Sequence, residues 1–293
     1  MNEQNTPKTN INWYPGHMAK TKRLISEKYN LIDIVYELVD ARIPYSSKIK
    51  GIDSLIKNKP RILVMTKSDL CDISETKKWV KYYEEKGYKV LLLNLNEPKA
   101  HIQLIDETNI LMQSMQEKRR EKGLKEKEIR ALVIGIPNVG KSTLINRLAK
   151  KNVAQVGNNP GVTKNLTWLK TKSNILLMDS PGILWPKFDD ETIAFNLASM
   201  TAIKSEILPL DDVAIYILKT LDKYYPNILQ NRYKIDQLNE DFEEIYNKIG
   251  KHIGAIISGG EIDFDRVSTT IVNDIKQEKI KGITFDRINK NDI

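Results

Sequence analysis

The chain has 293 residues, of which 41% are hydrophobic, and this length is enough for one α/β domain of ordinary size and a smaller second one. No apolar run is long enough to span a membrane, the polar start MNEQNTPKTN has no signal-peptide core, and the single Cys71 excludes internal disulfides and multi-cysteine zinc sites, so we expect a cytoplasmic protein. The formal net charge of +8 is uneven, because residues 1–186 carry 32 basic and 19 acidic side chains whereas residues 187–293 carry 14 and 19.

Hydrophobic periodicity predicts a basic helix at residues 18–29, followed by alternating strands and helices. This alternation predicts an α/β fold with a mostly parallel sheet that helices cover on both faces. Ligands of such sheets bind at the carboxyl ends of the strands. The expected strands are 31–39, 61–66, 89–95, 130–135, 166–171 and 174–179, and the expected helices between them are 52–58, 74–86, 101–120 and 141–150.

From about residue 187 onward the pattern becomes helical, and no further strand is expected. We therefore divide the chain into residues 1–186, an α/β domain with a basic N-terminal arm, and residues 187–293, a small all-helical C-terminal domain. The helices expected in the second domain are 193–202, 211–224, 235–249 and 263–278.

A phosphate-binding loop is predicted at residues 135–142, GIPNVGKS, which satisfy the pattern G-x-x-x-x-G-K-[ST] between an apolar strand and a helix. Its backbone N–H groups and the helix N-terminus would surround phosphate oxygens, Lys141 would supply a positive charge, and Ser142 would bind Mg²⁺. A plain glycine-rich turn is the alternative. The nucleotide-binding residues expected in this loop are Asn138, Val139, Gly140, Lys141, Ser142 and Thr143.

Two later segments complete the predicted phosphate site. Asp179 ends a predicted strand, where it could hold Mg²⁺ through water, and the N–H of Gly182 could meet the terminal phosphate. Thr163, between this segment and the phosphate loop, could close over the metal when the terminal phosphate is present. Each signal alone would be a common turn or loop. With the phosphate loop they predict Lys141, Thr163 and Gly182 as catalytic residues and Ser142, Thr163 and Asp179 as Mg²⁺ ligands.

A base-binding site is predicted at residues 66–69, TKSD, which follow an apolar strand and look like the guanine-specifying [NT]-K-x-D motif of GTPases. Asp69 would accept hydrogen bonds from N1–H and the 2-amino group of guanine, which adenine cannot offer together. Thr66 belongs to the same motif, and the stem of Lys67 would lie over the purine. A second base contact is expected at Asn94, in the segment 94–96.

The motifs stand in permuted order, because the base motif precedes Lys141 by some seventy positions whereas ordinary GTPases carry it after the phosphate loop. A site depends on which strand ends are adjacent rather than on chain order, so a circularly permuted P-loop GTPase domain can build the same pocket. The segment 179–182 now leads directly into the helical domain. We therefore expect nucleotide state to change that domain's position.

The whole chain resembles the ribosome biogenesis GTPase A family in these motifs and in three further segments, WYPGHMAK at 13–20, DARIP at 40–44 and GGEID at 259–263. The resemblance implies GTP hydrolysis late in assembly of the large (50S) ribosomal subunit, stimulated by the subunit, with rRNA and ribosomal proteins as partners. We expect a monomer. The tail departs from the family's pattern at Glu278 and Lys279, where a Gly-Lys pair is expected.

Hydrolysis needs a group that orients water, and Ile183, which follows Gly182, cannot do so. His17 is the family's candidate for catalysis; a helix-capping or rRNA-contacting histidine is the equal alternative. Asn138 resembles the asparagine with which potassium-activated GTPases hold K⁺, although turn geometry alone also favours asparagine. The expected small molecules are therefore GTP and GDP with Mg²⁺, and K⁺ at Asn138.

Basic surfaces attract RNA phosphates through counterion release, although charged runs also serve solubility alone. The segment 118–130 carries seven basic and three acidic residues, and the first helix is also basic. We therefore expect rRNA to contact both. Two alternatives stay open: a nucleotide-switched rRNA-binding scaffold whose hydrolysis is incidental, and a permuted GTPase that acts on the small subunit or on tRNA.

Overall fold

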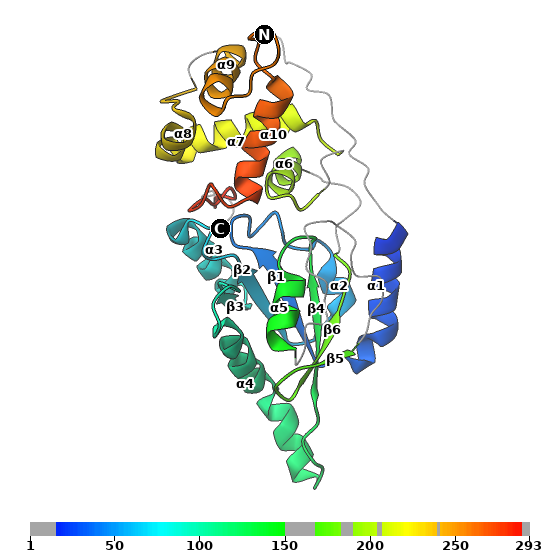
Figure 1. Ribbon diagram of the computed structural model, residues 1–293. Coiled ribbons are helices and arrows are strands. Elements are labelled where there is room, and N and C mark those ends of the chain that lie inside the picture. The colour runs from blue at the N-terminus through cyan, green and yellow to red at the C-terminus, as the bar shows by residue number, and fades with distance from the viewer. Residues whose placement is uncertain (1–15, 150–167, 183–189, 204–206, 239–240, 289–293) are drawn as a thin grey trace, which may run out of the picture.

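The computed structural model describes residues 16–149, 168–182, 190–203, 207–238 and 241–288, with backbone only for residues 16–20. It has an α/β unit, here called the G domain, and a helical unit that lies beyond one edge of the sheet (Figure 1). The described strands form one six-stranded sheet in the order β3-β2-β1-β4-β6-β5. Their bounds are β1 Ile34–Asp40, β2 Arg61–Thr66, β3 Lys89–Leu92, β4 Ile129–Gly135, β5 Trp168–Lys170 and β6 Ile175–Asp179.

The sheet is parallel except for β5, which pairs antiparallel with β6. The mostly parallel sheet predicted from sequence is thus confirmed. All seven residues of β1 are buried, as expected for a strand that has neighbours on both sides and helices over both faces. In the register, Asp40 lies opposite Thr66, and Val133 lies opposite Asp179. The carboxyl ends of β1, β2, β4 and β6 therefore meet at one edge.

The G-domain helices follow the predicted positions closely. The predicted strand 89–95 is shorter in the structure, because the chain leaves the sheet in a turn at residues 94–97, which the Asn94 side chain stabilises by accepting from the N–H of Asn96. Tyr36 of β1 lies 2.8 Å, oxygen to oxygen, from Thr108 and so links the sheet to a long helix. The described helices of this unit are α1 Gly16–Lys28, the 3₁₀ helix η1 Tyr29–Leu31, α2 Ile52–Ile56, α3 Ile73–Glu85, α4 Ala100–Glu121 and α5 Lys141–Leu148.

The helical unit has five described helices. The predicted helix 235–249 overlaps α9 but begins too early, because α8 ends where Lys234 takes a left-handed conformation (φ 61°) and α9 begins only at Phe242. Pro226 at the first turn of α8 separates it from α7, a start signal that the sequence already held. The bounds are α6 Glu191–Ser199, α7 Leu210–Tyr224, α8 Pro226–Tyr233, α9 Phe242–Ile253 and α10 Phe264–Lys276.

The chain returns to the G domain after α10. The N–H groups of Gly282 and Ile283 donate to the carbonyl of Leu70, and the N–H of Phe285 donates to the carbonyl of Arg42 at 2.7 Å. The segment 282–287 therefore lies on the loops that follow β1 and β2, although it comes last in the sequence. None of the described helices is long and apolar enough to cross a membrane.

Candidate functional site

The predicted phosphate loop joins β4 to α5 with the backbone that such a loop requires. Gly140 and Asn138 have positive φ angles of 103° and 58°. A side chain at Gly135 would meet Val139 Cγ1 at 2.8 Å and the Leu38 carbonyl oxygen at 2.9 Å, so only glycine fits there. The loop therefore turns tightly into the N-terminus of α5, where backbone N–H groups and the helix dipole favour an anion.

The Lys141 ammonium lies inside this loop. Its Nζ donates to the carbonyl oxygens of Gly135 at 3.0 Å and Ile136 at 2.7 Å. Burial lowers the pKa of Lys141 to about 8, and the nearby Asp179 carboxylate opposes this only in part. A phosphate anion beside the amine would favour its charged form.

Nucleotide binding should therefore be accompanied by proton uptake at Lys141. At pH 8 we expect GDP binding to take up about half a proton, and at pH 7 about a tenth, because the amine is partly neutral before binding and charged afterwards. Calorimetry in two buffers of different ionisation enthalpy measures this number. Lys141→Arg, which stays charged at both pH values, is the matched control and should take up none. Equal, near-zero uptake by the parent protein at both pH values would contradict this assignment.

Asp179 and Gly182 approach the phosphate loop from the end of β6. The Asp179 side chain is buried, and Ser180 Oγ donates to the carbonyl of Val133 at 2.7 Å, which fixes the turn on β4. Gly182 lies directly against Pro137: a β-carbon at Gly182 would stand 2.8 Å from Pro137 Cγ and 2.9 Å from Pro137 N. The structure thus brings Asp179, Gly182 and the phosphate loop together.

Two of the predicted catalytic residues, Thr163 and His17, have no described side chain. Thr163 lies outside the described residues, as does Ile183, the residue after Gly182. His17 belongs to the first turn of α1, but its side chain is outside what the structure describes. Their proposed roles therefore remain predictions from sequence.

The base motif lies beside the phosphate loop, as the permuted order requires. Thr66 Oγ1 lies 2.6 Å from the carbonyl oxygen of Val139 in the phosphate loop and 3.1 Å from that of Val39 in β1. Lys67 has a left-handed backbone (φ 60°), which turns the chain at the end of β2 so that Asp69 faces the pocket. The hydroxyl of Thr66 therefore fixes the distance between the base site and the phosphate site.

A buried ion cluster supports Lys67 from behind. Lys67 Nζ donates to Asp40 Oδ2 at 2.8 Å, and Arg42 donates to both oxygens of the same carboxylate, at 3.0 and 2.8 Å. Burial alone would raise the pKa of Asp40, but the two cations outweigh it and hold the pKa well below its usual value. Sequence reasoning noted the segment 40–44 without giving it this role, because the contact is formed across two strand ends.

The second predicted base contact, Asn94, lies close to the pocket but points elsewhere. Its Oδ1 accepts from the backbone N–H of Asn96, and its Nδ2 donates to Glu97. Asn96 instead lines the pocket, and its Nδ2 donates to Asp69 Oδ2 at 3.3 Å. An asparagine two positions before a turn residue often caps that turn, and this signal could have favoured Asn96.

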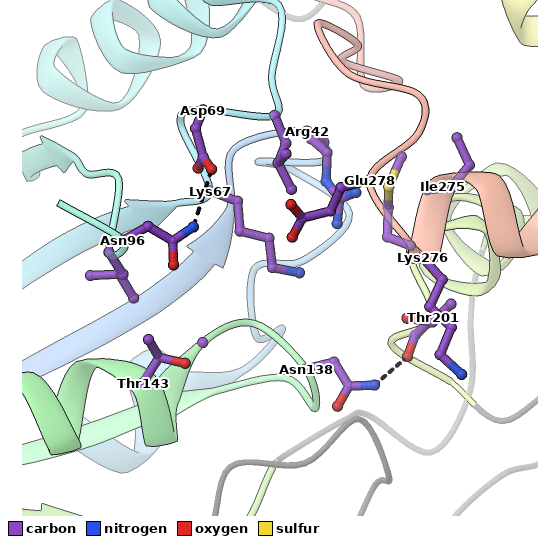
Figure 2. A pocket seen from close by; sticks show the side chains of 14 residues that line it. Arg42, Lys67, Asp69, Asn96, Asn138, Thr143, Thr201, Ile275, Lys276 and Glu278 are labelled. Carbon is purple, nitrogen blue, oxygen red and sulfur yellow. Dashed lines mark hydrogen bonds between the residues drawn. The ribbon is translucent and has the colours of Figure 1, made fainter. Parts of the chain in front are cut away.

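Base and phosphate residues line one cavity of about 230 Å³ (Figure 2). Part of its wall comes from the helical unit, which the sequence did not predict. Asn138 Nδ2 donates to the carbonyl of Thr201, at 2.7 Å, so the phosphate loop touches the segment after α6 directly. The lining residues of the helical unit are Met200, Thr201, Ile275, Lys276 and Glu278.

Glu278 extends from the end of α10 toward Lys67 and Arg42 (Figure 2). Its φ of 59° is the left-handed conformation that favours glycine, which accounts for the glycine expected at this position. Burial alone would lower the pKa of Arg42, but Asp40 and, to a lesser extent, Glu278 raise it above its usual value. A carboxylate from the helical unit therefore faces the cations of the base site.

Replacing Glu278 by glutamine should tighten GTP binding by about threefold, because it removes a negative charge that repels the triphosphate at the pocket wall. Equilibrium titration with a fluorescent GTP analogue measures the change. Glu261→Gln is the matched control, since Glu261 is exposed and precedes the opposite end of α10. Weaker binding by Glu278→Gln than by the control would show instead that the carboxylate supports the nucleotide.

Comparison with known proteins agrees with this geometry. Residues 130–257 match the family described as "50S ribosome-binding GTPase". Ribosome biogenesis GTPase A of Bacillus licheniformis is 46% identical over 277 residues, 94% of this chain and 98% of that protein. The protein of the same name from Priestia megaterium is also 46% identical, over 94% of this chain and 96% of its own length.

Among solved structures, GNP-bound YlqF from T. maritima superposes with a TM-score of 0.62. That alignment covers 92% of this chain and 98% of the other at 24% identity, which shows a shared fold. The fold likeness includes the permuted α/β domain and the helical C-terminal part. The 46% identity to the two relatives, over 94% of this chain, shows family membership as well as fold. The chain belongs to the ribosome biogenesis GTPase A family and is therefore a circularly permuted, guanine-nucleotide-binding GTPase of ribosome biogenesis.

Proposed function

We propose that this GTPase acts late in assembly of the large (50S) ribosomal subunit and that binding to the subunit stimulates its GTP hydrolysis. The observation that carries the proposal is the combination, in one chain, of the assembled GTP pocket with a basic projection of the G domain. The far end of α4 and the loop after it extend away from the body of the molecule (Figure 1). We further propose that the protein works as a monomer in the cytoplasm.

The α4 tip, residues 118–125, is suited to RNA phosphates. Lys118, Arg120 and Lys122 are exposed, and none of them forms an ion pair within the described part of the chain. Arg119 differs, because its Nε donates to the carbonyl of Lys125 and so holds the loop. The three exposed cations would bind a polyanion through counterion release without disturbing the fold.

The residues of the pocket take the following roles in this proposal. Asp69 reads guanine, with Thr66 and Lys67 supporting it, and the loop from Asn138 to Thr143 holds the phosphates. Asn94, predicted as a base contact, would instead shape the turn that presents Asn96. The backbone N–H of Gly182 would meet the terminal phosphate.

Mg²⁺ fits this donor set, because the buried Asp179 carboxylate stands at the strand end beside the first turn of α5, and hard cations prefer oxygen ligands. Asp179, Ser142 and Thr163 would hold it, and it would neutralise charge on the phosphate oxygens. We propose that Asn138 also holds K⁺ through its amide oxygen, since the amide nitrogen already donates to Thr201. Equal turnover in sodium and potassium salts would exclude that role.

His17 is proposed to position the attacking water when the subunit is bound. His17→Ala should lower subunit-stimulated hydrolysis and leave GTP affinity unchanged, because the residue would act only in the transition state. Normal stimulated turnover in this variant would remove His17 from the mechanism.

The function is tested by co-sedimentation and GTP turnover with purified subunits. We expect binding to large subunits and faster turnover in their presence. Neutralising Lys118, Arg120 and Lys122 to glutamine should weaken binding at least tenfold and reduce the slope of log affinity against log salt by about 2 to 3. Lys77, Lys234 and Lys251, exposed elsewhere, are the matched control triple.

Several outcomes would contradict the proposal. Binding without stimulated turnover would favour a nucleotide-switched rRNA scaffold, and binding only to small subunits or to tRNA would favour the other alternative. An unchanged salt slope in the tip variant would remove α4 from the RNA contact, even if large-subunit binding persists.

A further inference from the structure

A second cavity, of about 640 Å³, lies between the G domain and the helical unit and shares no lining residue with the nucleotide cavity. Its volume is within the range of roughly 300–1,000 Å³ that is usual for ligand pockets, and such pockets often lie between domains. Its walls come from the loop after β1, from α3, α6 and α7, and from the returning tail.

Two aromatic rings in this cavity are exposed and held from behind. Tyr45 is 46% exposed, and its ring stacks on the buried Trp79 at 5.8 Å between centroids with an interplanar angle of 27°. Tyr224 is 38% exposed, and its ring has the Arg287 guanidinium 4.1 Å and the Lys223 ammonium 5.1 Å from its centroid. Rings that are held in place and partly exposed can stack with a planar ligand.

Two lysines at this cavity form no ion pair among the described residues. Both are exposed, and their ammonium groups lie over aromatic rings: Lys219 Nζ is 5.1 Å from the centroid of Phe242, and Lys223 Nζ is 5.1 Å from that of Tyr224. Asp190, the acid at the rim, accepts from the N–H of Thr192 as the N-cap of α6. The two lysines are therefore available to an anion.

The buried acid of the cavity, Asp286, is fully occupied. Its carboxylate accepts from the N–H of Tyr45, from both the N–H and the hydroxyl of Ser46, and from Nδ2 of Asn196. Four short hydrogen bonds, of 2.5 to 2.8 Å, use the acceptor capacity of the two oxygens. Asp286 thus holds the two units together and does not compete for a cationic ligand.

Arg287 supplies a donor that the described residues leave unpaired. Its Nη1 pairs with Glu75 at 3.1 Å, and its Nη2 donates to the Tyr225 hydroxyl at 2.8 Å. The Nε–H, however, is buried and has no hydrogen-bond partner in the part of the chain that the structure describes. This nitrogen exposes less than 1 Å² to solvent and so does not face the open space of the cavity; Arg287 contributes to the wall through its guanidinium, which lies against Tyr224.

We propose that this cavity binds an unpaired nucleotide of an RNA chain, with its base stacked on Tyr45 or Tyr224 and its phosphates at Lys219 and Lys223. A nucleotide supplies both the planar ring that suits the exposed tyrosines and the anion that suits the two lysines. The proposal deepens the proposed function, on which it rests for the presence of RNA. It places a second RNA contact on the helical unit, whose net charge alone would not predict one.

The test compares two fluorescein-labelled RNA octamers, oligoadenylate and the same octamer with abasic central nucleotides, by fluorescence anisotropy on the full chain. We expect the parent protein to prefer the intact octamer by about tenfold, since base stacking on an aromatic side chain contributes on this scale. Tyr45→Leu with Tyr224→Leu should abolish this preference, whereas the corresponding phenylalanine variants should retain it. Equal affinities for both octamers in the parent protein would overturn the proposal.

A second arm tests the charge. Lys219→Gln with Lys223→Gln should weaken binding of the intact octamer about tenfold and reduce the slope of log affinity against log salt by about 1.4, two single-strand phosphate contacts. Lys234→Gln with Lys251→Gln is the matched control. An unchanged slope would overturn the assignment of the lysines.

The outcome can be separated from that of the proposed function. A parent protein that binds large subunits but does not distinguish the octamers retains the function and loses the cavity site. One that distinguishes them but does not bind subunits retains the site and loses the function. Failure to bind either octamer would assign the cavity to another kind of partner and overturn the proposal.

Discussion

Asp69→Asn should weaken GTP binding at least 100-fold and at the same time create binding of xanthosine triphosphate. A carboxylate accepts from both N1–H and the 2-amino group of guanine, whereas an amide presents one acceptor and one donor. Xanthine has a carbonyl oxygen in place of the 2-amino group, so it matches the amide. Asp69 is exposed beside Asn96 at the open side of the cavity, so the substitution leaves the fold intact.

The measurement is an equilibrium titration of both nucleotides on both proteins. Asp106→Asn, an exposed position on α4, is the matched control and should bind GTP as the parent does. A variant that lost GTP without gaining xanthosine triphosphate would show only that the site was damaged. A variant that retained GTP affinity would remove Asp69 from base recognition.

Gly182→Ala should reduce GTP hydrolysis by about 100-fold or more, while GDP affinity changes by no more than a few-fold. The new β-carbon would stand 2.9 Å from the backbone nitrogen of Pro137, so the segment after β6 must move away from the phosphate loop. The Gly182 N–H would then no longer reach the terminal phosphate, and loss of one such donor costs on the order of 100- to 1,000-fold in rate. GDP lacks the terminal phosphate, so its affinity should depend little on the Gly182 N–H.

Single-turnover hydrolysis and GDP titration together measure this effect. Gly87→Ala is the control, because Gly87 has open space around it and lies far from the site; its φ is positive, 82°, unlike that of Gly182. The control should lose some stability and keep its turnover. Hydrolysis by Gly182→Ala at the parent's rate would contradict the contact between Gly182 and the phosphate loop as a catalytic requirement.

The sheet could be predicted because each strand carries its own signal. Apolar runs such as residues 62–65 of β2 and 131–134 of β4 predict buried parallel strands, and the rule on strand ends then places Thr66 and Gly135 at one edge. The predicted ends of strands and helices were less accurate where a local turn sets them. The end of β3 and the break between α8 and α9 depend on single residues, Asn94 and Lys234, whose conformations the periodicity does not reveal.

Contacts between distant segments could not be predicted. The Asp40–Lys67 ion pair, the bond from Asn138 to Thr201 and the position of Glu278 in the pocket all join elements whose relative placement depends on packing. The return of residues 282–287 to the G domain is of the same kind, because a buried Asp286 reads in sequence as an ordinary surface acid. Local motifs therefore predicted residues that line the candidate nucleotide site, whereas its wall from the helical unit emerged only from the fold.

The central claim is that Asp69 and Lys141 bind opposite ends of one guanine nucleotide. Thr66 already joins their two loops through its hydroxyl, 2.6 Å from the carbonyl of Val139. The most direct test is a parallel titration of GTP and ATP on the parent protein. We predict that GTP binds and that ATP binds about 1,000-fold or more weakly, because adenine would leave the Asp69 carboxylate without its donor pair. Equal retention of the two nucleotides, or retention of neither, would contradict it.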